Sequence, residues 1–170
     1  MSSTVEDTSI GQSVRRREDD RFLRGRGNYV DDCAEADDLH AVFIRSVHAH
    51  ARIVSIDKSS AQSASGVRAI FTGQDLEASG VRPIPCGWKI TNRDGTPMAE
   101  PDHHPLCIDT VRHVGDPVAV VIADSLLEAK DAAEQVVVVY DPLPAIVSTE
   151  DANLPDAPQV WPEIARNLCA

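Results

Sequence analysis

Apolar and polar positions between residues 118 and 140 follow the order strand, helix, strand. Val118 to Ala123 is an almost unbroken apolar run, which predicts a strand covered on both faces. Ser125 and Glu128 have the spacing of a capping box, and the helix they begin is expected to run to about Gln135. Val136 to Tyr140 predicts a second buried strand, because consecutive β-branched residues suit a pleated surface. About a dozen residues join the strands, enough for a right-handed crossover, so we expect parallel pairing.

An earlier part of the chain repeats this plan. Residues 39–45 and 52–56 predict strands, Asp57 is interpreted as the cap of a short helix over 58–64, and 67–71 predict a third strand. The order of apolar strand, Asp, Ala-bearing helix and Val-led strand is a weak internal echo of the later unit. It does not indicate a solenoid repeat.

Small residues are expected to form the buried face of the later helix, because they stand at helical spacing: Leu126, Ala129 and Ala133. Asp124 lies where the first strand of that unit ends. We interpret Asp57 and Asp124 as helix caps and not as a catalytic pair of carboxylates.

The remaining segments lack such periodicity. Residues 79–105 are crowded with proline and glycine and predict a long loop, of the kind that is usually functional or bound to a partner. Residues 106–111 predict a short strand. We therefore expect one mixed α/β domain over residues 33–150, with an N-terminal arm at 1–32 and an extended C-terminal tail at 151–170.

Charge and composition narrow the function classes. The 16 basic and 27 acidic residues give a formal net charge of −11, which argues against nucleic acid and anionic membranes as partners. Aromatic residues are only 4% of the chain, so the core is expected to consist of aliphatic side chains and alanine. No apolar stretch has the length of a signal-peptide core or a membrane span, and we expect a cytoplasmic protein with reduced thiols.

Candidate chemistry is sparse in these residues. His48 and His50 could share one face of a strand, but a third metal ligand is not evident, and turn hydrogen bonds are the alternative. The four cysteines are far apart and form no CxxC pair. Gly115 sits in a tight turn that leads into a strand, so its role is expected to be structural. We accordingly assign no catalytic, cofactor-binding or metal-binding residue.

The arm is unusual because six arginines lie among five acidic residues between Val14 and Asp32. One interpretation is a solvated arm whose charges compensate one another. The other is an arm that docks on a partner, since arginines without apolar neighbours need carboxylates or carbonyls to hold them. On the second interpretation the arm and the long loop form a contact surface with these residues: Arg17, Arg21, Arg24, Arg26 and Trp88.

Several motifs, in order, resemble one family. They are RFLRGRGNYVDD, LHAVFIRSVHAHARIVSID, GVRAIFTGQDL, VRHVGDPVAVVIAD and VVVVYDPLPAIV. The whole match covers nearly the entire chain, from about Val14 to Asn167. Together they resemble the start of the molybdenum-binding large subunit of the xanthine dehydrogenase, aldehyde oxidase and carbon monoxide dehydrogenase family. Within that family, RGRGNYVDD and LHAVFIRS resemble the bacterial carbon monoxide dehydrogenase-like branch.

This resemblance implies the α/β hammerhead fold and an oxidoreductase that hydroxylates a substrate carbon with oxygen from water. It also implies a molybdenum–molybdopterin centre, with [2Fe–2S] clusters and FAD on partner chains or domains. The family's cofactor loops and catalytic glutamate lie downstream of the hammerhead, so we expect this chain alone to bind no cofactor and to be inactive. The alternative is a non-catalytic interaction domain or a truncated remnant.

Overall fold

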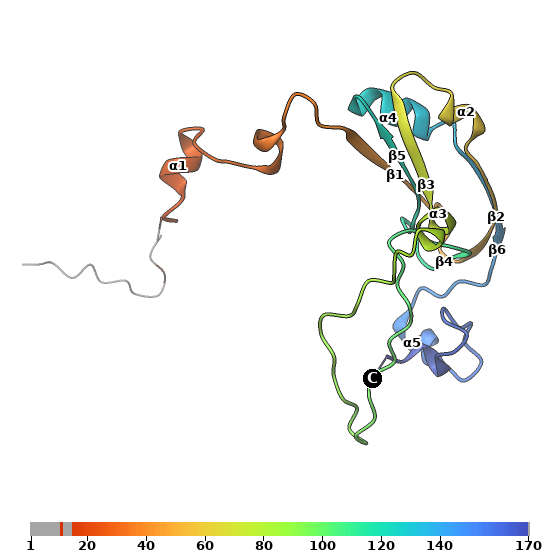
Figure 1. The fold of residues 1–170 in the computed structure, drawn as a ribbon. Coiled ribbons are helices and arrows are strands. Elements are labelled where there is room, and N and C mark those ends of the chain that lie inside the picture. Colours follow the sequence, from red (N-terminus) through yellow and green to blue (C-terminus); the bar gives the residue numbers. More distant parts are fainter. Residues whose placement is uncertain (1–10, 12–14, 170) are drawn as a thin grey trace, which may run out of the picture. The chain divides into compact units, whose positions relative to one another are not determined.

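The computed structural model describes residue 11 and residues 15–169. The chain divides between Asp38 and Leu39 into two compact units. Figure 1 shows the course of the chain through both. In the described residues no helix is both long enough and apolar enough to cross a membrane.

The described residues of the first unit form one short helix and one 3-10 turn. Helix α1 spans Asp19–Leu23, and a 3-10 turn spans Val30–Cys33. The rings of Phe22 and Tyr29 lie 5.9 Å apart, and the Tyr29 amide donates to the Asp32 carboxylate at 2.9 Å. Neither element buries a residue, so local contacts hold the described part of this unit together, and residues 15–38 form no core of their own.

The second unit carries the regular structure. Its strands and helices, in chain order, are β1 (His40–Arg45), β2 (Ala51–Asp57), α2 (Ser59–Gln62), β3 (Val67–Thr72), α3 (Gly73–Ala78), β4 (Thr110–Val111), β5 (Pro117–Ala123), α4 (Leu126–Ala133), β6 (Val137–Pro142) and α5 (Thr149–Ala152), followed by a 3-10 turn at Ala165–Asn167. The predicted strands and the two crossover helices are present, so the mixed α/β class is confirmed.

The strands form two three-stranded sheets, and every pairing is antiparallel. The first sheet has the order β1-β5-β3 and the second has the order β4-β2-β6. The expected parallel pairing of β5 with β6 is therefore wrong. Strands β1 and β3 occupy both edges of β5, so no edge remains for β6, which pairs with β2 instead.

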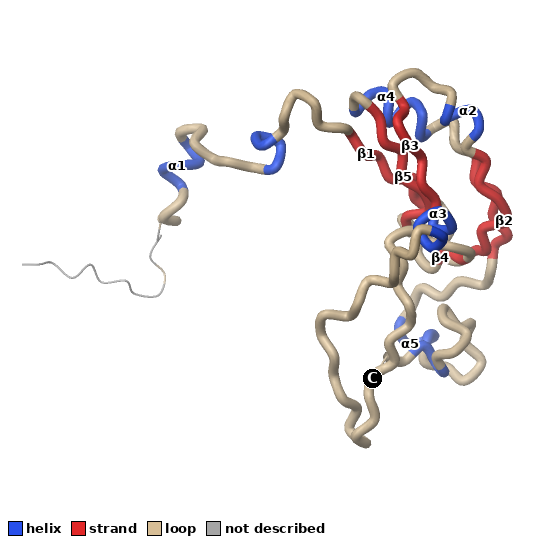
Figure 2. Tube along the Cα trace, viewed as in Figure 1, coloured by secondary structure: helices blue, strands red, loops and turns tan. Residues whose placement is uncertain are grey.

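The internal echo is visible in the topology. The unit β2-α2-β3 leads from the second sheet to the first, and the unit β5-α4-β6 leads from the first to the second. The pairings β3 with β5 and β2 with β6 join the two units, as Figure 2 shows. Each crossover helix thus links two sheets, whereas a parallel crossover would return to the same sheet.

The core lies where the two sheets and helix α4 meet. One cluster is built on Ala61, Ile70, Val121, Ala132 and Val136, and a second on Ala51, Cys107, Val111 and Val118. The half-buried Ile44 and Val138 contact both clusters. The core is aliphatic and alanine-rich, as the composition predicts.

Two burial predictions were wrong in detail. Helix α4 buries Ala129 and Ala132, whereas Leu126, expected on the buried stripe, is 47% exposed. Strand β6 was expected to be buried, but Val137 and Val139 are exposed. The reason is that β6 is an edge strand with only one face against the core.

The helix starts were predicted with mixed success. Ser125 caps α4 as expected, accepting the Glu128 amide at 3.2 Å, and its hydroxyl donates to the Glu128 carboxylate at 2.7 Å. Asp57 accepts the Ser59 amide at 3.0 Å and so supports the start of α2. Asp124 is not a cap: its carboxylate accepts two bonds from the Arg68 guanidinium, at 2.6 and 2.8 Å.

Candidate functional site

The arginines of the predicted contact surface lie in the first unit and are exposed. Two of them pair with acids in α1 or at its ends: Arg24 lies 2.8 Å from Asp20 and Arg21 lies 3.5 Å from Glu18. Such exposed pairs contribute about 0–1 kcal/mol each and can exchange for other carboxylates. This pairing agrees with the self-compensating interpretation of the arm, but it leaves the guanidinium groups accessible.

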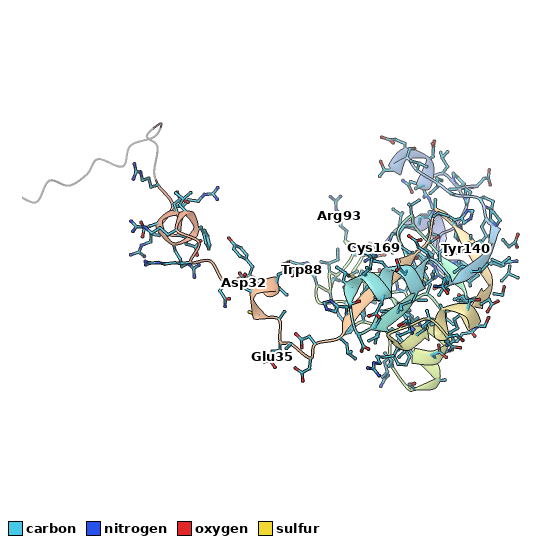
Figure 3. All side chains as sticks on the ribbon, turned by 90° about the horizontal axis from the view of Figure 1, so that it is seen from above. Asp32, Glu35, Trp88, Arg93, Tyr140 and Cys169 are labelled. Carbon is cyan, nitrogen blue, oxygen red and sulfur yellow. The ribbon has the colours of Figure 1, made fainter. Side chains whose placement is uncertain are left out.

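Trp88 lies in the second unit, on the long loop between α3 and β4. The loop extends away from the sheets and returns alongside itself (Figure 1), with Ile84 donating to the His103 carbonyl at 2.7 Å and Met98 to the Ile90 carbonyl at 3.2 Å. Trp88 is 79% exposed. The side chain of Arg93, near the tip of the loop, points outward from the same segment (Figure 3).

The loop therefore has a definite backbone path without a core. An ion pair between Lys89 and Glu100, 2.8 Å apart, and a bridge between Thr91 and Pro97 tie its two limbs. An exposed indole on such a segment is typical of a surface that another protein covers. The arginines and Trp88 belong to different units, so they are two candidate contacts.

A cleft of about 400 Å³ lies between the base of this loop and the C-terminal segment. Arg112 forms one wall: its guanidinium carbon lies 3.6 Å from the centre of the Trp161 ring, and Nε donates to the Val160 carbonyl at 3.3 Å. The ring of His103 lies 5.7 Å from that of Trp161. The tail at 151–170 was expected to be extended, but it folds back to place Trp161 on Arg112.

Asp116 is the buried carboxylate beside this cleft. It accepts the Arg112 amide at 2.8 Å, and the Asp116 backbone carbonyl accepts the Ser46 amide at 2.8 Å. Gly115, at φ +92°, makes the turn that brings Asp116 there. The predicted structural role of this glycine is consistent with that geometry.

Cys107 lies in the core next to Asp116. Burial, together with a hydrogen bond to the Asp116 carboxylate and its negative charge, raises the pKa of the Cys107 thiol from 9.0 to about 12. The thiol is therefore neutral at physiological pH and behaves as a small apolar side chain rather than as a nucleophile.

The stability of the parent relative to a Cys107→Ala variant is expected to fall in alkali. The pKa of this thiol is higher in the folded than in the unfolded chain. Its contribution to the free energy of unfolding is therefore fully present below the unfolded pKa near 9 and is lost as the pH rises toward the folded pKa of about 12. Thermal melts of both proteins across this range test it, and the stability of the parent relative to the variant should fall as pH increases. A difference that stays constant would contradict the burial of this thiol.

The two histidines considered as metal ligands make other contacts in the structure. The His48 ring packs on Tyr140, with centroids 4.9 Å apart, and His50 Nδ1 shares a hydrogen bond with the Pro144 carbonyl at 2.9 Å. Within residue 11 and residues 15–169, no three His, Cys, Asp or Glu side chains are grouped to hold a metal ion. Both contacts reach distant parts of the chain, so the expected hydrogen bonds within turns are not what these two rings make.

Sequence reasoning missed the cluster of Arg112, Asp116 and Trp161. Arg112 and Asp116 share the motif VRHVGDP, whose tight turn was recognised without its carboxylate being assigned a partner. Trp161 stands in a proline-rich stretch without periodicity, 49 positions after Arg112. Nothing in the local pattern indicates such a long-range contact.

Comparisons with known proteins place this arrangement in a family. Residues 24–144 match the family described as "Aldehyde oxidase and xanthine dehydrogenase, a/b hammerhead domain". The chain is 37% identical to the carbon monoxide dehydrogenase large chain of Afipia carboxidovorans, covering 96% of this chain and 20% of that one. It is 38% identical to subunit gamma of the 6-hydroxypseudooxynicotine dehydrogenase complex of Paenarthrobacter nicotinovorans, covering 84% of this chain and 18% of that one.

Solved structures give the same relationship. A reconstituted CO dehydrogenase from Oligotropha carboxidovorans matches with a TM-score of 0.71 and 38% identity, over 87% of this chain and 17% of that one. Quinoline 2-oxidoreductase from Pseudomonas putida 86 matches equally well, with a TM-score of 0.71 and 38% identity, over 84% of this chain and 17% of that one. The chain spans about a fifth of the length of these relatives. It belongs to the aldehyde oxidase and xanthine dehydrogenase family, as an α/β hammerhead domain.

Proposed function

We propose that this chain is the hammerhead portion of a molybdenum hydroxylase and contributes structure and subunit contacts, without being catalytically complete alone. The observation that carries the proposal is the match of nearly the whole chain to one segment of much longer oxidoreductase chains. The described residues support it too, since their buried polar groups, such as Asp116, are engaged in holding turns.

The relatives' names also bear on substrate choice. At 35–38% identity the chain resembles proteins named for carbon monoxide, for xanthine and for nicotine derivatives. One segment that is equally similar to all of them carries no evident substrate signature. We therefore propose that the groups which select the substrate lie outside these 170 residues.

We propose that the cofactors also lie outside these residues. In the assembled enzyme we propose a molybdenum–molybdopterin centre in the rest of the large chain, and [2Fe–2S] clusters and FAD on iron–sulfur and FAD subunits. Thiolate clusters need four cysteines at one site, whereas Cys33 lies in the first unit and Cys107 is buried in the core of the second. We propose a cytoplasmic location for this assembly.

The isolated chain is expected to be colourless and inactive. A purified sample should hold no stoichiometric molybdenum and should not hydroxylate an aldehyde or a purine, because no nucleophile, base and ligand set converge in the described residues. Metal analysis and a dye-linked activity assay test this. Stoichiometric molybdenum together with turnover would show that the chain is catalytically complete.

We further propose that the arm and the long loop contact the rest of the enzyme through Arg17, Arg21, Arg24, Arg26 and Trp88. The exposure of these side chains supports this proposal, because α1 buries no residue and Trp88 is 79% exposed. Arginine forks give directional pairing with carboxylates, and tryptophan is enriched where proteins meet.

Hydrogen exchange is expected to separate the free and assembled states. Amides over residues 15–29 and 79–105 should exchange rapidly in the isolated chain and slowly in the complex, because contacts with the partner would suppress local opening. Strand β5 serves as the internal control, since its amides should be protected in both samples. Equal exchange of the two segments in both samples would place the contact surface elsewhere.

A further inference from the structure

One face of the first sheet carries aromatic and aliphatic side chains in rows across all three strands. Phe43 of β1 lies opposite Val120 of β5, and Val120 lies opposite Phe71 of β3. The next row on the same face is Ala41, Ile122 and Ala69. Side chains directly opposite one another on adjacent strands share a face, so the six residues form one continuous apolar surface, here called the outer face.

The opposite face of this sheet is the covered one. Val121 and Ile70 point into the core cluster that contains Ala132 of α4, and α4 contacts all three strands. On the outer face, Phe43 is 49% exposed and Phe71 is 38% exposed. Two phenylalanines at this exposure, in register across a sheet, differ from the scattered single apolar residues that are normal on protein surfaces.

The outward side of the second sheet gives an internal comparison. Its residues include Arg52, which pairs with Asp141 at 3.9 Å, and Ser55, which lies opposite Val139. Charged and hydroxyl groups thus interrupt its valines. The outer face of the first sheet has no charged residue within its two rows, and the difference favours it as the surface that is buried in the assembled protein.

Charged groups do flank the outer face at both ends. Arg45 follows the rows on β1, with its guanidinium 5.7 Å from the Phe43 ring and a bond to the Gly115 carbonyl at 2.9 Å. At the other end Arg68 pairs with Asp124. An apolar centre with a polar rim is the anatomy of a protein–protein interface.

We propose that the outer face, formed by Phe43, Phe71, Val120, Ile122, Ala41 and Ala69, packs against the portion of the molybdenum hydroxylase large chain that lies beyond the hammerhead segment. This inference rests on the proposed function. The relatives' chains are about five times longer than the match, so that portion is the largest available surface. Rows without charge suit a permanent contact, since obligate interfaces are more apolar than transient ones.

Site-specific photo-crosslinking tests the occupant. The chain, produced in its own cells, carries the photo-reactive analogue p-benzoyl-phenylalanine in place of Phe43 or, separately, Phe71. The same analogue in place of Val139, on the outward side of the second sheet, is the control. After irradiation of the purified assembly, adduct peptides are identified by mass spectrometry.

Adducts from positions 43 and 71 are expected to map to the molybdenum-binding portion of the large chain. The control position 139 should give a much lower yield of adducts to that portion. Adducts to residues 15–38 of this chain, or to a second copy of it, would overturn the occupant. A molybdenum-containing assembly that gives no protein adduct from either position would overturn the docking face alone. Absence of any such assembly would overturn the proposed function, and this inference with it.

Discussion

Replacing Val121 with Asp is expected to unfold the second unit. Val121 is fully buried at the centre of β5, the middle strand of the first sheet, and packs against Ile70 and Ala132. An unpaired carboxylate in that position costs several kcal/mol, which is comparable to the whole stability of about 5–15 kcal/mol of a small domain. Circular dichroism should show loss of the cooperative thermal transition at neutral pH.

Val139→Asp is the matched control for this change. Val139 is 46% exposed on the edge strand β6, so the same substitution leaves the carboxylate in water and loses about 1 kcal/mol or less of strand propensity. Its melting temperature should stay within a few degrees of the parent. If Val121→Asp melts like Val139→Asp, the core is not where the structure places it.

The second large effect is expected from Gly73→Ala. Gly73 begins helix α3 and is buried, and a Cβ built there would lie 2.6 Å from the Cys107 carbonyl carbon and 2.8 Å from the Leu106 carbonyl oxygen. These are backbone atoms and cannot rotate away, so α3 and the segment before β4 must separate. Overpacking of this kind costs about 1–3 kcal/mol or more, and urea unfolding should show a matching fall in the midpoint.

Gly87→Ala separates this clash from a general effect of adding a methyl group. Gly87 lies in the long loop, and no atom stands within 4 Å of a Cβ built there. The variant should be as stable as the parent or gain about 0.4–1 kcal/mol, because alanine restricts the unfolded chain. Equal midpoints for Gly73→Ala and Gly87→Ala would show that α3 does not pack tightly on the Leu106–Cys107 segment.

Local patterns predicted most of the strands because burial in this fold follows runs of apolar residues. The runs at 118–123 and 136–140 lie within a residue or two of β5 and β6. The run at 106–111 forms a strand only at Thr110–Val111. Leu106 is buried in the core, but it belongs to no strand. Apolar character alone does not distinguish these two causes.

The pairing of the strands could not be predicted from the local pattern of apolar residues. The connection through α4 is long enough for either a parallel return or a change of sheet, and the choice depends on β1 and β3, whose residues are distant in sequence. The same limit applies to the cleft. Arg112 and Trp161 meet because the C-terminal segment folds back, and no spacing in the sequence encodes that contact.

The candidate contact residues were chosen for their chemistry, and the structure describes them without testing that role. Arg21 and Arg24 pair locally and Trp88 is exposed, as both the solvated and the docked interpretations require. The outer face could not be foreseen from the sequence, because its rows exist only in the antiparallel register that joins β1, β5 and β3.

The most direct test of the central claim is the native mass and metal content of the protein purified from its own cells. The account predicts that the chain migrates within a large assembly that contains stoichiometric molybdenum and a chain resembling the rest of the family's large subunit. A small species without molybdenum would contradict it.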